Sequence, residues 1–156
     1  MLTMSGPDIM WFIDHALHRM VSIVVELGDH DANVAPDLPG ANSPYAILTH
    51  CLGVMEFWGG QMIAGRAIHR DRPAEFRATG AVADLADRAA AARRRLDADL
   101  ENFDSTAATA VPPDPEYAEL PFGRTQGGVL VHIYEELSQH LGHLELTRDV
   151  IRSTSR

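Results

Sequence analysis

The sequence has no lysine and a single cysteine among its 156 residues. All 13 basic side chains are therefore arginines, and the 22 acidic residues give a formal net charge of −9. This charge disfavours nucleic acid as a partner, because contacts to phosphates need basic side chains. The lone Cys51 excludes an internal disulfide and fits a reducing compartment. We therefore expect a cytoplasmic protein without a nucleic-acid partner.

Long apolar runs and the pattern of a signal peptide are also missing. No stretch approaches the roughly 18 consecutive apolar residues of a membrane-spanning helix, so we expect no membrane partner. The N-terminal residues lack a charged segment followed by an apolar one. Apolar residues make up 46% of the chain and charged residues 22%, as in ordinary globular proteins. A chain of this length predicts a single domain over residues 1–156.

Four segments have the apolar content and the capping residues of helices. Ser5 or Gly6 can cap the first helix, and Asn42 or Ser43 can cap the second. No alternating strand pattern longer than a few residues occurs. The expected helices span about residues 7–30, 44–63, 82–103 and 125–152, with long connections at 65–80 and 104–128. The sequence therefore predicts an all-α fold, a four-helix bundle, whose core can hold a metal between facing helices.

The eight histidines carry the most information about function. His132, Glu136 and His140 follow one another at intervals of four residues, which places them on one face of a helix. His50 lies in the second helical segment. Two imidazoles and a carboxylate can hold a divalent metal with one coordination position open, as in catalytic zinc sites, and they suit Zn²⁺, Ni²⁺, Fe²⁺ or Co²⁺. The competing interpretation is a core histidine at 50 and surface histidines paired with Glu136.

Three segments carry a family resemblance, at residues 42–58, 65–76 and 135–145. The first, Asn-Ser-Pro-Tyr-Ala-Ile-Leu-Thr-His-Cys-Leu-Gly-Val-Met-Glu-Phe-Trp, resembles the second-helix signature of the DinB/YfiT-like superfamily. The three together are similar to its actinobacterial branch with the mycothiol-dependent maleylpyruvate isomerase N-terminal domain. The resemblance implies a DinB-like bundle with His50, Glu136 and His140 as ligands of a divalent metal, with zinc expected before nickel or iron.

Further polar residues are candidates for supporting roles. His143 and His132 could form hydrogen bonds to the metal ligands, and His132 could instead carry protons. Both could equally be solvated or core histidines. The arginines of the 65–80 connection could bind an anionic substrate, or could form salt bridges on an acidic surface: Arg66, Arg70, Arg72 and Arg77. Residues 117–123 could lie across the mouth of the bundle, and we expect Cys51 to be a small buried hydrophobe.

The resemblance implies a metal-dependent S-transferase for a low-molecular-weight thiol. The expected cosubstrate is mycothiol, and its sulfur would attack an electrophilic small molecule. Isomerase-type proteins of this branch carry a further C-terminal domain without a counterpart in this sequence, so we expect transfer rather than isomerisation. Two alternatives remain open: a metal-dependent hydrolase with His132 or His143 as base, and a non-catalytic metal-binding bundle that forms a homodimer. The sequence assigns no catalytic residue.

Overall fold

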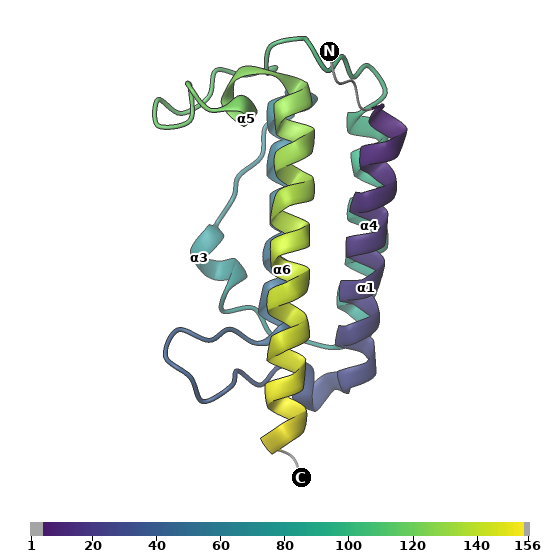
Figure 1. The fold of residues 1–156 in the computed structure, drawn as a ribbon, viewed down its shortest axis with the longest axis vertical. Helices are drawn as coiled ribbons and strands as arrows, with labels where there is room; N and C mark the ends of the chain where they lie inside the picture. The colour runs from purple at the N-terminus through teal and green to yellow at the C-terminus, as the bar shows by residue number, and fades with distance from the viewer. Residues whose placement is uncertain (1–4, 155–156) are drawn as a thin grey trace.

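Four long helices lie side by side along the long axis of the protein in its computed structural model, which describes residues 5–154 (Figure 1). No strand occurs among these residues, so the prediction of an all-α fold is confirmed. Residues 1–4, part of the segment without a signal-peptide pattern, lie outside the described range. The elements are α1 (Gly6–Ala32), α2 (Pro44–Met55), η1 (Glu56–Ile63), α3 (Arg72–Glu75), α4 (Val82–Asp99), α5 (Pro121–Arg124) and α6 (Gln126–Thr154).

The helices begin where the capping residues predict. The Ser5 hydroxyl accepts a hydrogen bond from the Asp8 amide at 3.2 Å, and the Ser43 hydroxyl accepts one from the Ala46 amide at 3.2 Å. The prediction for the third helix is wrong at its C-terminus, because α4 ends at Asp99 rather than at residue 103. The chain turns there, and this turn packs Phe103 against the core.

The second predicted helix is continuous but changes its winding. After Met55 the α-helical pattern gives way to a π-helix, η1, in which the Ala64 amide donates to the Gly59 carbonyl at 3.0 Å. Segments of π-helix are rare and often occur at functional sites. A side chain at Gly59 would meet Leu96 of α4 at 2.6 Å, so glycine permits a close approach of the two helices here.

The connection between residues 64 and 81 decides how the site is built. Helices α2 and α4 run in the same direction, so this connection returns along the length of the bundle, with α3 about midway (Figure 1). Helix α3 packs against α2. The second long connection lies at the end of the bundle where α6 begins, and its Ala110 amide donates to the Met62 carbonyl at 2.8 Å. Each connection thus brings its side chains to the bundle surface near α2 and η1.

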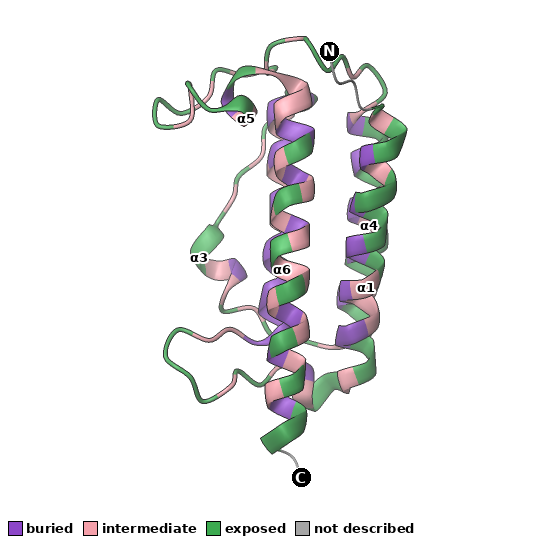
Figure 2. Cartoon of the chain, in the orientation of Figure 1, coloured by how far each residue is buried: buried purple, intermediate pink, exposed green. Residues whose placement is uncertain are grey.

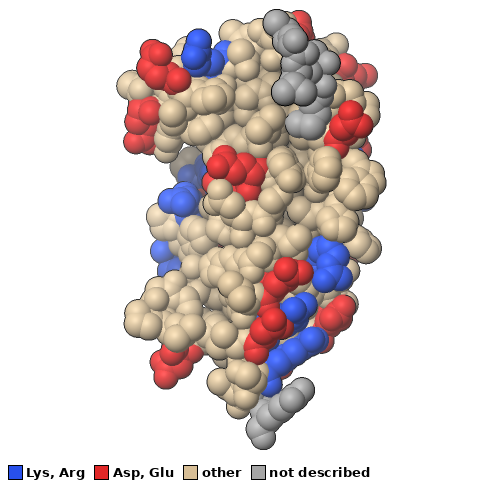
Figure 3. All heavy atoms as spheres, viewed as in Figure 1, with Lys and Arg blue, Asp and Glu red and all other residues tan. Residues whose placement is uncertain are grey.

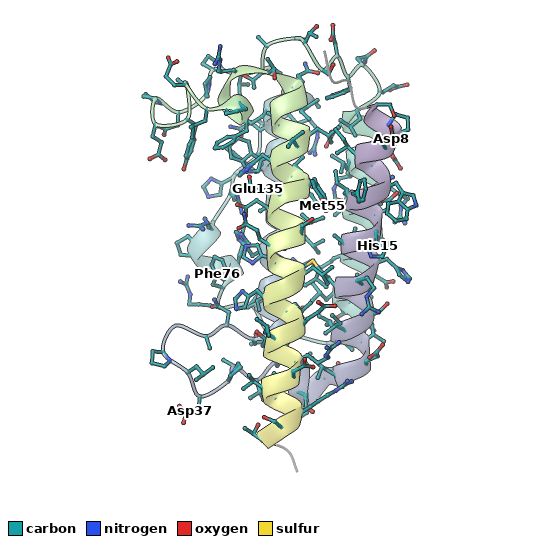
Figure 4. The ribbon with its side chains drawn as sticks, in the orientation of Figure 1. Asp8, His15, Asp37, Met55, Phe76 and Glu135 are labelled. Atoms are coloured by element: carbon teal, nitrogen blue, oxygen red, sulfur yellow. The ribbon has the colours of Figure 1, made fainter. Side chains whose placement is uncertain are left out.

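The core runs along the whole interior between the four long helices. Figure 2 shows buried residues on the inward sides of α1, α4 and α6 and exposed residues on their outer sides. Met55 lies between α6 and α1, whereas His15 points away from the bundle (Figure 4). Among residues 5–154, no helix has both the length and the apolar character of a membrane span.

Candidate metal centre

Three side chains from α2 and α6 converge on one point inside the bundle wall. His50 Nε2 lies 3.4 Å from Glu136 Oε2, and His140 Nε2 lies 3.6 Å from the same oxygen. All three candidate ligand atoms lie within 4.8 Å of one another. Helix α6 presents its two groups one turn apart, and the antiparallel α2 presents His50 opposite them. The structure therefore brings together the three side chains that the sequence predicts as metal ligands.

His50 is held by a carboxylate that the sequence analysis missed. Its Nδ1 lies 2.8 Å from Oε2 of Glu75, at the end of α3, and only 9% of Glu75 is exposed. Arg70 in turn donates two hydrogen bonds to Glu75, from Nε to Oε1 at 2.7 Å and from Nη2 to Oε2 at 2.9 Å. A carboxylate on Nδ1 keeps the proton on that nitrogen and leaves Nε2 free to bind a metal. No local signal marks Glu75, because its role depends on the path of the 64–81 connection.

The electrostatics of the group favour a positive charge at its centre. The imidazoles of His140 and His50 hold the pKa of the Glu136 carboxyl far below its ordinary value, against the effect of partial burial. Burial disfavours the protonated form of His50, yet Glu136 and Glu75 outweigh it and raise the pKa of that imidazole. Both shifts show that the carboxylates of Glu136 and Glu75 favour a positive charge beside them, which in this structure is the charge of a protonated imidazole.

The donor set and its spacing fit a divalent transition metal. Bonds of about 2.0–2.2 Å to a common ion place neighbouring ligand atoms roughly 3–4 Å apart, which matches the observed 3.4 and 3.6 Å. His140 Nδ1 is buried and has no hydrogen-bond partner among the described residues. A histidine pair with one carboxylate leaves a coordination position for water or substrate. Glu136 and the two histidines are thus a possible metal-binding group.

A cavity of about 380 Å³ opens onto this group. Its walls combine residues of α2, η1, the two long connections and α6: His50, Val54, Phe57, Trp58, Arg70, Arg72, Tyr117, Phe122, His132 and Glu136. Tyr117 and Phe122 come from the segment that we expected at the bundle mouth. Because His50 and Glu136 are part of the wall, a small molecule in the cavity would reach the candidate metal position.

Comparison with known proteins assigns this chain to a family. A family model described as mycothiol-S-transferase matches residues 8–153. The chain belongs to the mycothiol S-transferase family. The family is DinB-like, which confirms the resemblance seen in the sequence, and its name implies a transferase enzyme. Searches among curated proteins and among solved structures found no match.

The two remaining histidines of α6 lie in different places in this transferase. His132 is in the cavity wall, where its ring stacks on Phe122 with centroids 4.1 Å apart. Its Nδ1 lies 3.2 Å from Oε2 of Glu135. His143 lines a separate cavity beside the 36–41 connection, and its ring lies 6.0 Å from the His140 ring, centroid to centroid, without a hydrogen bond between them among the described residues. Burial, and then the charge of His140, lower the pKa of His143.

The arginines predicted to bind substrate have different surroundings, and Arg77 does not line the cavity. Arg66 pairs with Asp99 and Glu56, away from the cavity, so its guanidinium is already engaged inside the transferase. Arg70 lines the cavity, but its guanidinium is already paired with the Glu75 carboxylate. Arg72 also lines the cavity and lies 5.7 Å from the centre of the Phe76 ring. Geometry therefore leaves Arg72 as the candidate for substrate binding.

The cysteine of the transferase is fully buried. Cys51 follows His50 on α2 but has no exposed surface. Burial raises the pKa of its thiol well above the ordinary value, and the nearby Glu136 and Glu75 raise it further. A thiol in such surroundings is a poor nucleophile, because the thiolate is the reactive form. Cys51 is therefore a poor candidate for a reacting sulfur.

Proposed function

We propose that this protein is a metal-dependent S-transferase that joins mycothiol to a small electrophile. The observation that carries the proposal is the convergence of His50, Glu136 and His140 beside a cavity, in a chain of the mycothiol S-transferase family. A divalent cation held by these groups would lower the pKa of a bound thiol and keep its sulfur as thiolate near neutral pH.

The protein's own residues have distinct tasks in this scheme. Glu75, fixed by Arg70, orients the His50 ring so that Nε2 faces the centre. Glu136 supplies the negative charge that favours a cation at the centre. His132, in the wall of the same cavity, is the base to which we assign the proton of the incoming thiol.

The reaction is a substitution at carbon. The sulfur electron pair forms a new carbon–sulfur bond to the electrophile, and the leaving group departs with the electron pair of the bond that breaks. With a bromobimane the leaving group is bromide, and the thiol proton passes to the base and then to water. No oxidant or reductant is needed, so mycothiol and the electrophile are sufficient reactants.

The test is a conjugation assay with mycothiol and monobromobimane, read by the fluorescence of the thioether. Metal analysis of the purified protein comes first, followed by removal of the metal with a chelator and its replacement. We expect conjugation above the uncatalysed rate, its loss with the metal, and its return with Zn²⁺ or another divalent ion. In a cobalt-substituted sample, mycothiol should produce a thiolate charge-transfer band.

Other results of this assay would support a hydrolase or a non-catalytic metal-binding bundle instead. Equal rates before and after removal of the metal would exclude metal dependence. Hydrolysis of an ester or amide, without conjugation of mycothiol, bacillithiol or glutathione, would show a metal-dependent hydrolase. Metal binding without turnover of any substrate would show a non-catalytic bundle.

A further inference from the structure

The cavity beside the metal centre has a chemical character that points to a class of electrophile. We infer that the electrophile is a flat aromatic compound that carries a carboxylate, an inference that rests on the proposed function. Two separate features of the cavity wall carry it, the aromatic rings and the single arginine without an acidic partner.

Aromatic rings from three separate parts of the chain lie together in the wall. Trp58 of η1 meets Phe122 edge to face with ring centroids 5.3 Å apart, and Phe122 stacks on His132 of α6 at 4.1 Å. Tyr117 completes this side at 6.0 Å from Trp58. Such walls offer flat apolar surfaces and ring edges, which bind flat aromatic molecules better than flexible chains of the same size.

Outside the proposed metal centre, the wall carries one unpaired positive charge, that of Arg72. Its one acidic residue is Glu136, which belongs to the proposed metal centre. Arg70 is neutralised by two hydrogen bonds to Glu75. Arg72 lines the same cavity, is exposed, and has no acidic partner among residues 5–154. An anionic group on the ligand would therefore find a free guanidinium, the group best shaped to bind a carboxylate.

Arg72 lies at a suitable place relative to the reacting centre. The Phe76 ring stacks on the His50 ring with centroids 4.5 Å apart, and the Arg72 guanidinium lies over Phe76 at 5.7 Å (Phe76 is labelled in Figure 4). One aromatic ring thus separates the cation from the proposed ligand His50. A ligand with its carboxylate at Arg72 can extend along the aromatic wall and place its electrophilic carbon near the metal centre.

The experiment compares four electrophiles with the metal-loaded protein and mycothiol. Chlorodinitrobenzoate and its carboxamide share one aromatic ring and one leaving group, chloride. Iodoacetate and iodoacetamide are an aliphatic pair with the same difference in charge. We expect the highest kcat/KM for chlorodinitrobenzoate after correction for the uncatalysed rates. Arg72→Gln should lower kcat/KM for this substrate about fivefold, the effect of one exposed ion pair, and change it less than about twofold for the carboxamide.

Arg77→Gln is the matched control, because Arg77 lies in the same connection, is exposed, and does not line the cavity. It should leave all four rates as in the unchanged protein. Phe122→Leu tests the ring wall separately. It should lower kcat/KM more for the two aryl substrates than for the aliphatic pair, which reports any effect through the stacked His132, with the KM for mycothiol unchanged.

The outcomes separate this inference from the proposed function. Turnover of all four electrophiles without preference for charge or ring, unaltered in Arg72→Gln, would overturn the inference and leave the transferase intact. A rise in the KM for mycothiol in Phe122→Leu would show that the aromatic wall holds the thiol instead, which also overturns it. Failure of every electrophile, bromobimane included, would overturn the proposed function itself.

Discussion

The connection at residues 64–81 contributes to two clusters of charge, and they are satisfied in different ways. In the first, between η1 and α4, Arg66 donates to both oxygens of Asp99 at 2.8 and 2.9 Å and to Glu56 at 2.9 Å. Arg95 donates to the second oxygen of Glu56 at 2.9 Å. Every carboxylate in this cluster has a guanidinium partner.

In the second cluster, between α2 and α6, the side chains at the edge are paired with an arginine, whereas those at the centre have no guanidinium partner. At the edge, Arg70, Glu75 and His50 form a chain of hydrogen bonds that resembles the first cluster. At the centre, His50, Glu136 and His140 point at one another without a guanidinium between them. The two clusters use similar residue types. The direction of the donor atoms, rather than the presence of charge, separates a structural network from a candidate binding centre.

Ion pairs on the bundle surface differ from both clusters because their side chains are exposed to solvent. Figure 3 shows basic and acidic atoms side by side near the C-terminal end of α6, where Arg19 pairs with Glu145 and Arg152 with Glu26 at 3.5 and 3.6 Å. All four side chains are about half exposed. Exposed pairs of this kind contribute roughly 0–1 kcal/mol each, so we assign them no part in the site.

The largest expected effect is loss of metal binding when one of the three proposed ligands is removed. His140→Ala should reduce metal affinity by more than about 100-fold, because removing one of three ligands leaves an incomplete set, while helix content stays near that of the unchanged protein. His15→Ala is the control, and it should retain the metal because His15 is exposed on α1 and points away from the bundle (Figure 4). Metal content after dialysis measures the retained metal, and far-ultraviolet circular dichroism measures the helix content. An unchanged metal affinity in His140→Ala would show that the ligand set is wrong.

The next largest effect on metal affinity should come from Glu75, at the edge of the second cluster. Glu75→Gln should weaken metal binding by about 10- to 100-fold, because the carboxylate no longer fixes the His50 ring and its tautomer. Competition with a chromogenic chelator gives the affinity. Glu135→Gln serves as control, since Glu135 is exposed on α6 (labelled in Figure 4). An unchanged affinity in Glu75→Gln would contradict the positioning role of Glu75.

A substitution in the first cluster should lower the free energy of unfolding without changing the catalytic rate. Arg66→Gln should cost about 2 kcal/mol in the free energy of unfolding, because Asp99, whose side chain is 6% exposed, loses its partner. Values of kcat/KM per folded molecule should not change. Urea unfolding and the mycothiol assay measure the two effects, with Arg77→Gln as the exposed control at less than about 0.5 kcal/mol. A change in the KM for the electrophile would restore Arg66 as a substrate-binding residue.

The smallest expected effect comes from one methyl group behind the centre. In Gly53→Ala the new Cβ would meet the Glu75 carboxylate, whose Cδ lies 2.6 Å from that position. Displacement of Glu75 should lower metal affinity about fivefold, the equivalent of roughly 1 kcal/mol of strain. Gly142→Ala meets nothing within 4 Å, so it should stabilise α6 by roughly 0.5–1 kcal/mol and leave the metal affinity alone. Equal affinities in the two variants would show that Glu75 can move without consequence.

The sequence by itself determined the helices and the residues that they present. Capping at Ser5 and Ser43, and the four-residue spacing of Glu136 and His140, are local properties, because helical geometry depends on neighbouring residues alone. The same reasoning extended the third helix too far, since the turn after Asp99 depends on packing of Phe103 against the core.

Only the tertiary structure decided which side chains meet. Residues 64–81 have no periodic pattern from which a path could be predicted, and their route along the bundle follows from the parallel course of α2 and α4. That route brings Glu75 to His50, pairs Arg66 with Asp99 and leaves Arg72 without an acidic partner in the cavity wall. The physical reason is that helix formation is set by short-range spacing, whereas contacts between distant segments are set by the packing of the whole bundle.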